Sequence, residues 1–339
     1  MALVGTINAS NDFAFKNRII NGAMTIAQRA TSSNAVSGGG YTTLDRWNLF
    51  QNLGAMNIAQ SSTAPTGFSN SIQFTVSTAA SQTSSATSLV APNQSIEGFN
   101  TADLMWGTAN AKSITVSVWV YSSLIGQYAI WIRNSAADRY YATPFTITTA
   151  NTWQQVTATI AGDTSGTWVG ATNGIGLTIG ICLAAGSSRV GTGNTWSGST
   201  FYGVTGQVDW QATASNTFYF TGFQVEVGTV ATSFDFRSYG TELALCQRYY
   251  EQFVVGSGAP DNILLSGVLT GSNCTSTAFF KVTKRANPSW ALLSGTSWTN
   301  TPNNSQTSTN AAVFQNTTSG YFYLGGGSAG QGISFSAEL

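Results

Sequence analysis

Short runs of alternating apolar and polar residues fill the chain from residue 41 to 228, and clusters of Gly, Asn, Ser and Thr separate them. The clearest run is residues 114–121, where Ile114, Val116, Val118 and Val120 share one face of a predicted strand. Further predicted strands are residues 128–133, 153–160, 174–184 and 217–227. Many short strands without helical periodicity predict an all-β jelly-roll sandwich over residues 41–236.

A helical pattern follows this region. In residues 237–253, apolar side chains recur at helical spacing, and we expect a helix of about three turns that serves as a hinge. The residues that define its apolar face, and that we also expect at a trimer contact, are Leu243, Cys246, Tyr249, Tyr250 and Phe253. Residues 254–339 return to short β runs and predict a small C-terminal β tip, which trimerisation would stabilise because small domains bury little surface alone.

The first 40 residues differ from the rest because they hold few strand-like runs and end in a Ser37–Gly40 glycine run. We interpret residues 1–40 as an N-terminal attachment segment. Neither a basic n-region with an apolar h-region nor a continuous apolar stretch of about 20 residues occurs, so we expect no membrane insertion and no export signal.

Charged residues make up only 8% of the chain, 13 basic against 13 acidic, well below the roughly 25% of an ordinary soluble protein. Ser, Thr, Asn and Gln must therefore provide solubility. Without a basic field for phosphate groups we expect no nucleic-acid partner, and neutral sugars suit such a surface better.

The chain contains no histidine, which excludes Ser-His-Asp and Cys-His catalysis and imidazole metal sites. Its three cysteines are far apart, and we interpret them as small apolar residues. A glycosidase needs only two carboxylates, but the scattered acids of the sandwich form no local motif. We expect no catalytic residues, no cofactor and no metal, with a polysaccharide-cleaving enzyme as the open alternative.

The predicted strands 114–121 and 128–133 read as a hairpin. If Val118 pairs with Ile132, then Trp119 lies opposite Trp131 on the face away from the core. Sugar rings stack on indoles, so our first candidate glycan-binding set is Trp119, Tyr121, Trp131 and Arg133. The alternative is that this face packs against a second sheet, a loop or a trimer neighbour.

Aromatic residues in the Gly/Ser/Asn-rich connections form a second candidate set: Trp168, Trp196, Tyr202 and Trp210. The alternative is that these side chains cap the ends of the sandwich. A third set lies in the predicted tip: Trp290, Trp298, Tyr321 and Tyr323.

Residues 220–253 carry a specific resemblance. They read FTGFQVEVGTVATSFDFRSYGTELALCQRYYEQF, and the pattern "QxExG" followed by "ATxFxxRxYGxELxLCQRYY" closely resembles the hinge of tailed-bacteriophage fibre proteins. KNRIINGAMTIAQRAT at residues 16–31, followed by YTTLDRW at 41–47, resembles the N-terminal entry of such fibres. The strand order of the body looks like a carbohydrate-binding-module jelly roll.

The resemblance implies a virion structural protein, a homotrimeric fibre with a tail rather than a head mounting, that attaches to a host-surface glycan. It implies assembly in the host cytoplasm, exposure on the particle, and contact with other virion proteins through residues 1–40. The alternative is a cement protein that decorates the capsid or tail without a receptor role. The jelly-roll likeness also leaves a structural calcium as an alternative to our expectation of no metal.

Overall fold

The computed structural model describes residues 15–255, 268–270, 273–292, 313–315, 317–324 and 331–339. The chain divides into two compact units, Met1–Tyr239 and Gly240–Leu339, which we describe separately. None of the helices in this part of the chain has the length and apolar character that a bilayer crossing requires.

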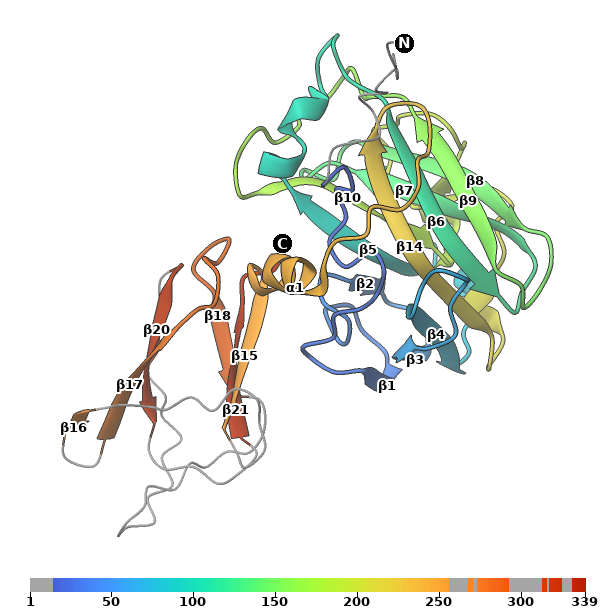
Figure 1. Ribbon diagram of the computed structural model, residues 1–339. Coiled ribbons are helices and arrows are strands. Elements are labelled where there is room, and N and C mark those ends of the chain that lie inside the picture. The colour runs from blue at the N-terminus through green and yellow to red at the C-terminus, as the bar shows by residue number, and fades with distance from the viewer. Residues whose placement is uncertain (1–14, 256–267, 271–272, 293–312, 316, 325–330) are drawn as a thin grey trace, which may run out of the picture. The chain divides into compact units, whose positions relative to one another are not determined.

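The first unit is an antiparallel β-sandwich of two six-stranded sheets (Figure 1). The first sheet, which we call the β14 sheet, has the order β1 (Ser32–Val36), β3 (Ala55–Ser61), β4 (Ser71–Thr78), β14 (Thr217–Val227), β6 (Ile114–Ser122) and β9 (Gln154–Ile160). The second, the β10 sheet, has the order β11 (Ala184–Ala185), β5 (Leu89–Glu97), β10 (Ile175–Cys182), β7 (Gly126–Arg133) and β8 (Tyr140–Ile147), with β2 (Asn48–Gln51) also paired to β5. The predicted all-β sandwich is confirmed.

Short elements connect the sheets. A parallel pair joins β12 (Val190–Gly191) to β13 (Gly203–Val204). Single 3-10 turns occur at η1 (Gln82–Ser84), η2 (Gly98–Asn100), η3 (Ala102–Leu104), η4 (Ser187–Arg189) and η5 (Trp210–Ala212).

The core between the sheets follows the alternation in the sequence. Ile114, Val116, Val118 and Val120 of β6 are fully buried and belong to the main hydrophobic cluster. Ile130 and Ile132 of β7 enter the same cluster from the β10 sheet. Period two therefore predicted correctly which side of each strand faces the core.

The predicted hairpin of residues 114–133 is wrong. β6 pairs with β14 and β9, whereas β7 pairs with β10 and β8 in the other sheet. The chain crosses from one layer to the other between Ser122 and Gly126. Both strands point apolar residues at one core from opposite sides, and a change of sheet satisfies the same alternation as a hairpin would.

The expected boundary at residue 40 is also wrong for the described part of that segment. Ile19, Met24 and Ile26 are buried in the main core, and β1 pairs with β3. Asn21 fastens the segment, since its side-chain amide donates to the backbone oxygens of Ile26 and Asp45 at 2.8 and 3.0 Å. Only Met24 and Ile26 are two positions apart, which is too short an alternation to predict a strand, so the sequence pattern did not reveal this part of the core.

The predicted helix is shorter than expected. α1 spans Tyr239–Gln247, and β15 begins at Tyr250. Tyr249, Tyr250 and Phe253 are buried but lie beyond the helix, and Phe253 packs against Phe280 and Phe335. Leu243 is partly exposed, whereas Cys246 is fully buried.

The helix ends early because Glu251 is paired in a strand. It lies on β15 and is 1% exposed, and one of its carboxylate oxygens lies 2.7 Å from Nζ of the equally buried Lys284. The backbone oxygen of Gln247, at the helix end, accepts a second hydrogen bond from the same ammonium group. A helix through Glu251 would not preserve this arrangement.

The second unit contains two small antiparallel sheets, as the β runs predicted. One has the order β15 (Tyr250–Val255), β21 (Gln331–Ser336) and β18 (Ser289–Leu292). The other has the order β16 (Val268–Thr270), β17 (Asn273–Phe279), β20 (Ser319–Leu324) and β19 (Val313–Gln315). Of the tip aromatics, Trp290 lies on β18, whereas Trp298 and the side chains of Tyr321 and Tyr323 lie outside the described residues.

Candidate glycan-binding surface

Three partly exposed aromatic side chains pack together on the outer face of the β14 sheet. Tyr121 of β6 pairs across the ladder with Tyr219 of β14, and their ring centroids are 5.0 Å apart. Trp153, immediately before β9, lies 5.5 Å from Tyr121 and 6.4 Å from Tyr219. We call Tyr121, Trp153 and Tyr219 the aromatic triad.

The local sequence explains this arrangement. On β14, Phe218 and Phe220 are fully buried, so the side chain between them, Tyr219, points outward. On β6, Val120 is fully buried, so the next side chain, Tyr121, points outward in the same way. Packing raises the pKa of Tyr219, because burial disfavours the charged phenolate and the neighbouring Tyr121 adds to the effect. Tyr121 and Tyr219 are thus held by the neighbouring strands β6 and β14, and Trp153 is placed beside them at the start of the edge strand β9.

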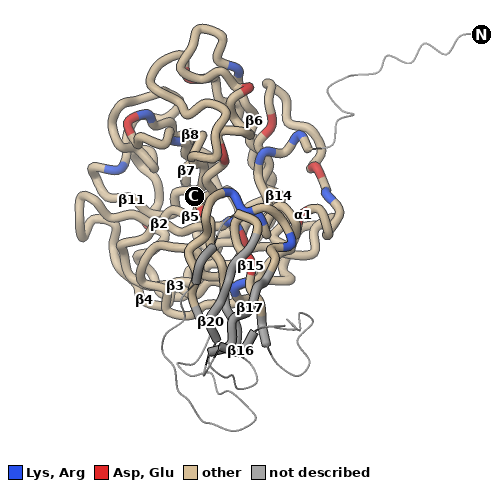
Figure 2. Tube along the Cα trace, turned by 90° about the vertical axis from the view of Figure 1, so that its left-hand side faces the viewer, with Lys and Arg blue, Asp and Glu red and all other residues tan. Residues whose placement is uncertain are grey.

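Neutral polar groups surround the triad. Gln73 of β4 pairs with Tyr219, and its amide donates to Oγ1 of Thr75 at 3.1 Å. Trp119, one outward position along β6 from Tyr121, pairs with Gln155 on one side and Thr221 on the other. Across the six strands of the β14 sheet the only Asp, Glu, Lys or Arg is Glu226, which is buried. Figure 2 shows β3 and β4 of this sheet without a charged position.

This chemistry suits an uncharged polyhydroxyl ligand. Aromatic faces offer apolar contact for the C–H groups of a sugar ring, and amides and hydroxyls beside them exchange hydrogen bonds with its hydroxyl groups. No acid-base group is needed for such contact. The exposed part of the outer face of the β14 sheet, around the aromatic triad, is therefore our candidate binding surface. Further along β14 the face is covered, since Gln224 and Glu226 are buried and hydrogen-bonded to residues 232–235.

Half of the first candidate set does not reach this surface. Trp131 is fully buried on the outer face of the β10 sheet, where it stacks on Phe50 at 5.9 Å and meets Tyr202 edge-on at 4.7 Å. The guanidinium of Arg133 lies 5.0 Å from the centre of the Phe50 ring. Residues 184–204, including β11 and β13, contribute to a second hydrophobic cluster over this face. The expectation that Trp131 shares a face with Trp119 is wrong. Of the alternatives, packing against a loop holds for Trp131, whose ring meets Tyr202.

The loop candidates divide in a similar way. Tyr202 is 5% exposed, and burial raises its pKa to about 12, while Trp210 is fully buried in the main core. Trp168 and Trp196 are partly exposed, and both meet Trp106, with centroid distances of 4.7 and 5.3 Å. These two therefore pack over one end of the sandwich.

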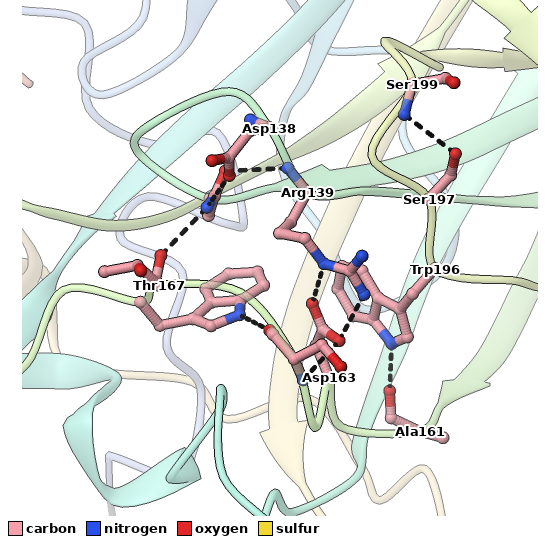
Figure 3. A network of polar contacts seen from close by, with 11 residues as sticks. Asp138, Arg139, Ala161, Asp163, Thr167, Trp196, Ser197 and Ser199 are labelled. Atoms are coloured by element: carbon pink, nitrogen blue, oxygen red, sulfur yellow. Dashed lines mark hydrogen bonds and ion pairs between the residues drawn. The ribbon is translucent and has the colours of Figure 1, made fainter.

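Hydrogen bonds fix the loops at this end (Figure 3). The indole N–H of Trp196 donates to the backbone oxygen of Ala161 at 2.9 Å, and that of Trp168 donates to Ser165 at 3.1 Å. Arg139 and Asp163 form a two-bonded ion pair, with both N–H···O distances 2.7 Å. The pKa of Arg139 is raised, mainly by this hydrogen bonding to Asp163.

The first unit also has two hollows. A cavity of about 60 Å³ lies beside Trp106 and Trp168. A wider depression of about 240 Å³ lies between η1 and the β12–β13 pair, lined by Gln82, Ser85, Ser187, Thr205 and Gln207 among others. No cluster of three or more His, Cys, Asp or Glu in the described ranges is arranged to hold a metal ion.

No family model and no curated protein matches the chain. Among solved structures, the enzymatically active domain of tailspike protein 4 of bacteriophage CBA120 is 10% identical with a TM-score of 0.36, covering 63% of this chain and 22% of that one. A putative sugar-binding protein of Bacteroides thetaiotaomicron is 12% identical with a TM-score of 0.36, covering 62% and 100%. The C-terminal family 22 carbohydrate-binding module of Clostridium thermocellum Xyn10B is 12% identical with a TM-score of 0.33, covering 55% and 89%. These similarities are too distant to assign a function.

Sequence reasoning missed Tyr219 and Trp153. The signal for Tyr219 was present, since Thr217, Tyr219 and Thr221 alternate with buried residues along β14. What the sequence did not give was the pairing of β14 with β6, because about 100 residues separate them. Trp153 could be joined to the set only through the pairing of β6 with β9.

Proposed function

We propose that this chain is a fibre-type structural protein of a tailed-bacteriophage virion and that it attaches to a neutral glycan on the host surface. The observation that carries the glycan part is the aromatic triad on the rigid, almost charge-free outer face of the β14 sheet. The virion part rests on the resemblance of residues 220–253 to fibre hinges.

The hinge motif has a structural role that agrees with this proposal. The carboxylate of Glu226 accepts hydrogen bonds from the backbone N–H and the hydroxyl of Thr232 at 2.8 and 2.7 Å. A guanidinium nitrogen of Arg237 donates to the backbone oxygen of Ile19 at 3.0 Å. These hydrogen bonds hold the segment that follows β14. The Arg237 bond also links this segment to the N-terminal segment of the same unit.

We further propose a homotrimer mounted on the tail, with residues 1–40 in contact with other virion proteins and no bond-breaking activity. Three copies bind a repetitive surface with greater avidity than one, so each site can be weak. Light scattering on the purified protein tests the assembly: a trimeric mass supports the proposal, and a monomer at micromolar concentration contradicts it. Immunogold labelling of particles tests the tail mounting.

A glycan array tests the binding function. We expect saturable binding by the wild type and a loss of about tenfold or more in affinity for Tyr219→Ala or Trp153→Ala, since stacking contributes on the order of 1 kcal/mol per ring beyond area burial. Tyr239→Ala is the matched control, because Tyr239 is 65% exposed and is not a residue of the β14 sheet.

Two further assays, incorporation into particles and release of reducing ends, separate the alternatives. A wild-type protein that binds no glycan but is incorporated normally into particles would favour the cement protein and contradict attachment. Release of reducing ends from host polysaccharide by the purified protein would show an enzyme and contradict the proposed absence of chemistry.

A further inference from the structure

The 60 Å³ cavity at the end of the sandwich differs from the outer face of the β14 sheet in shape and lining. It lies where η3, the loop after Asp163 and the start of β10 meet. Its apolar lining includes Leu104, Met105, Trp106, Trp168, Val169 and Leu177. No charged side chain lines it. Polar atoms as well as apolar side chains line it, so an occupant with both an apolar and a polar part suits it best.

One polar side chain of the lining lacks a good partner. Thr101 is 8% exposed, and its hydroxyl makes only two contacts, both 3.4 Å long, with the backbone oxygens of Glu97 and Gly98. A hydroxyl hydrogen bond is ordinarily about 2.7–2.8 Å long. This hydroxyl can turn toward a ligand at little cost.

The walls are held in place. The indole N–H of Trp106 donates to the backbone oxygen of Lys112 at 2.7 Å, and the rings of Trp106 and Trp168 meet edge-on at 4.7 Å. Met105 ends η3 in a left-handed conformation with φ of 54°. It is 39% exposed and lies at the open rim of the cavity.

Size restricts the occupant. At about 10–15 Å³ for one water, 60 Å³ holds about four to six heavy atoms. An acetamido group has four heavy atoms, with a methyl suited to the apolar walls and a carbonyl suited to the Thr101 hydroxyl.

We propose that this cavity binds the acetamido group of an N-acetylated sugar, and so selects acetylated glycans. The inference deepens the proposed attachment function and rests on it for its biological use, but the site is separate from the aromatic triad. The triad would contact sugar rings of any neutral kind, and the cavity would distinguish acetylated residues from the rest.

The test is a titration of the ¹⁵N-labelled full chain with N-acetylglucosamine and N-acetylgalactosamine, with glucose and galactose as matched sugars. The indole N–H signal of Trp168, identified by its loss in Trp168→Phe, should shift with the acetylated sugars. The plain sugars should bind about tenfold more weakly, as expected for a missing apolar group in a fitted pocket. Equal shifts with all four sugars would overturn the proposal.

Val169 provides the blocking variant. Its side chain lines the cavity and is partly exposed, so Val169→Phe should occupy cavity space at little cost to folding. We expect loss of the preference for acetylated sugars, and Thr101→Val should weaken it. Gly170→Ala is the matched control, because a Cβ built there meets nothing within 4 Å and leaves the cavity open. Retention of the full preference in both Val169→Phe and Thr101→Val would contradict the site.

The two proposals can fail separately. If Tyr219→Ala removes polysaccharide binding but keeps the shift of the Trp168 signal, both sites stand. A wild type that binds no array glycan but shows a shift of the Trp168 signal that Val169→Phe abolishes would overturn attachment and support the cavity. A wild type that binds glycans through the triad without any shift at Trp168 would overturn the cavity alone.

Discussion

Trp119 and Trp131 occupy equivalent positions on two successive strands, since both point away from the core that their neighbours fill. Trp119 is partly exposed on the β14 sheet, whereas Trp131 is fully buried on the β10 sheet under residues 184–204. Strand alternation determines the side of a sheet on which a residue lies, but not what covers that side. One outward tryptophan is therefore available to a ligand, and the other is part of a second core.

Truncation of Trp131 should lower the free energy of unfolding more than truncation of Trp119. Trp131→Ala removes a large side chain that contacts Phe50 and Tyr202, and we expect a loss of about 3–5 kcal/mol in the free energy of unfolding. Urea denaturation followed by circular dichroism measures it. A loss below about 1 kcal/mol would show that residues 184–204 do not pack on this face.

The covered face should also respond to alkaline pH. Burial raises the pKa of Tyr202 to about 12, above its ordinary value of about 10. The folded state then holds this proton more tightly than the unfolded state, so the contribution is complete below pH 10 and is lost as the pH rises to 12.

We expect Tyr202 to contribute a loss on the order of 2 kcal/mol of stability over that window, and Tyr202→Phe should remove that part. The alkaline loss from other buried tyrosines, such as Tyr128, should remain in both proteins. Denaturation midpoints of the two proteins at pH 9, 10, 11 and 12 provide the measurement. The same slope in both proteins would mean that other groups cause the alkaline loss.

Truncation of Trp119 should give the smallest change in stability. Because its ring is partly exposed, Trp119→Ala should cost about 1 kcal/mol or less in the free energy of unfolding, compared with the several expected for Trp131→Ala. The same urea titration tests it. If the two variants lost equal stability, the difference between the faces would disappear.

The sequence predicted the strands better than their partners. The alternation of residues 114–120 and 217–227 gave the buried face and nearly the bounds of β6 and β14. It did not predict which sheet each strand belongs to. β6 and β7 follow each other and look like a hairpin in sequence, but β6 pairs with β14 and β7 pairs with β10. Trp119 and Tyr121 were therefore placed correctly, and Trp131 and Arg133 were not.

Helical spacing was misleading at one point for a related reason. Leu243, Cys246 and Tyr250 fit a helix, but Tyr250 and Phe253 also sit on a strand whose Glu251 binds Lys284. That partner lies 33 residues away, and no local pattern contains it. Long-range pairs decided both the end of α1 and the membership of the aromatic triad.

Covalent labelling of tryptophan, mapped by mass spectrometry with and without bound glycan, tests the central claim most directly. We predict that Trp119 and Trp153 are labelled in the free protein and protected by saturating glycan, while Trp131 and Trp210 stay unlabelled throughout. Labelling of Trp131 in the folded protein, or unchanged labelling of Trp119 and Trp153 with glycan bound, would contradict the account.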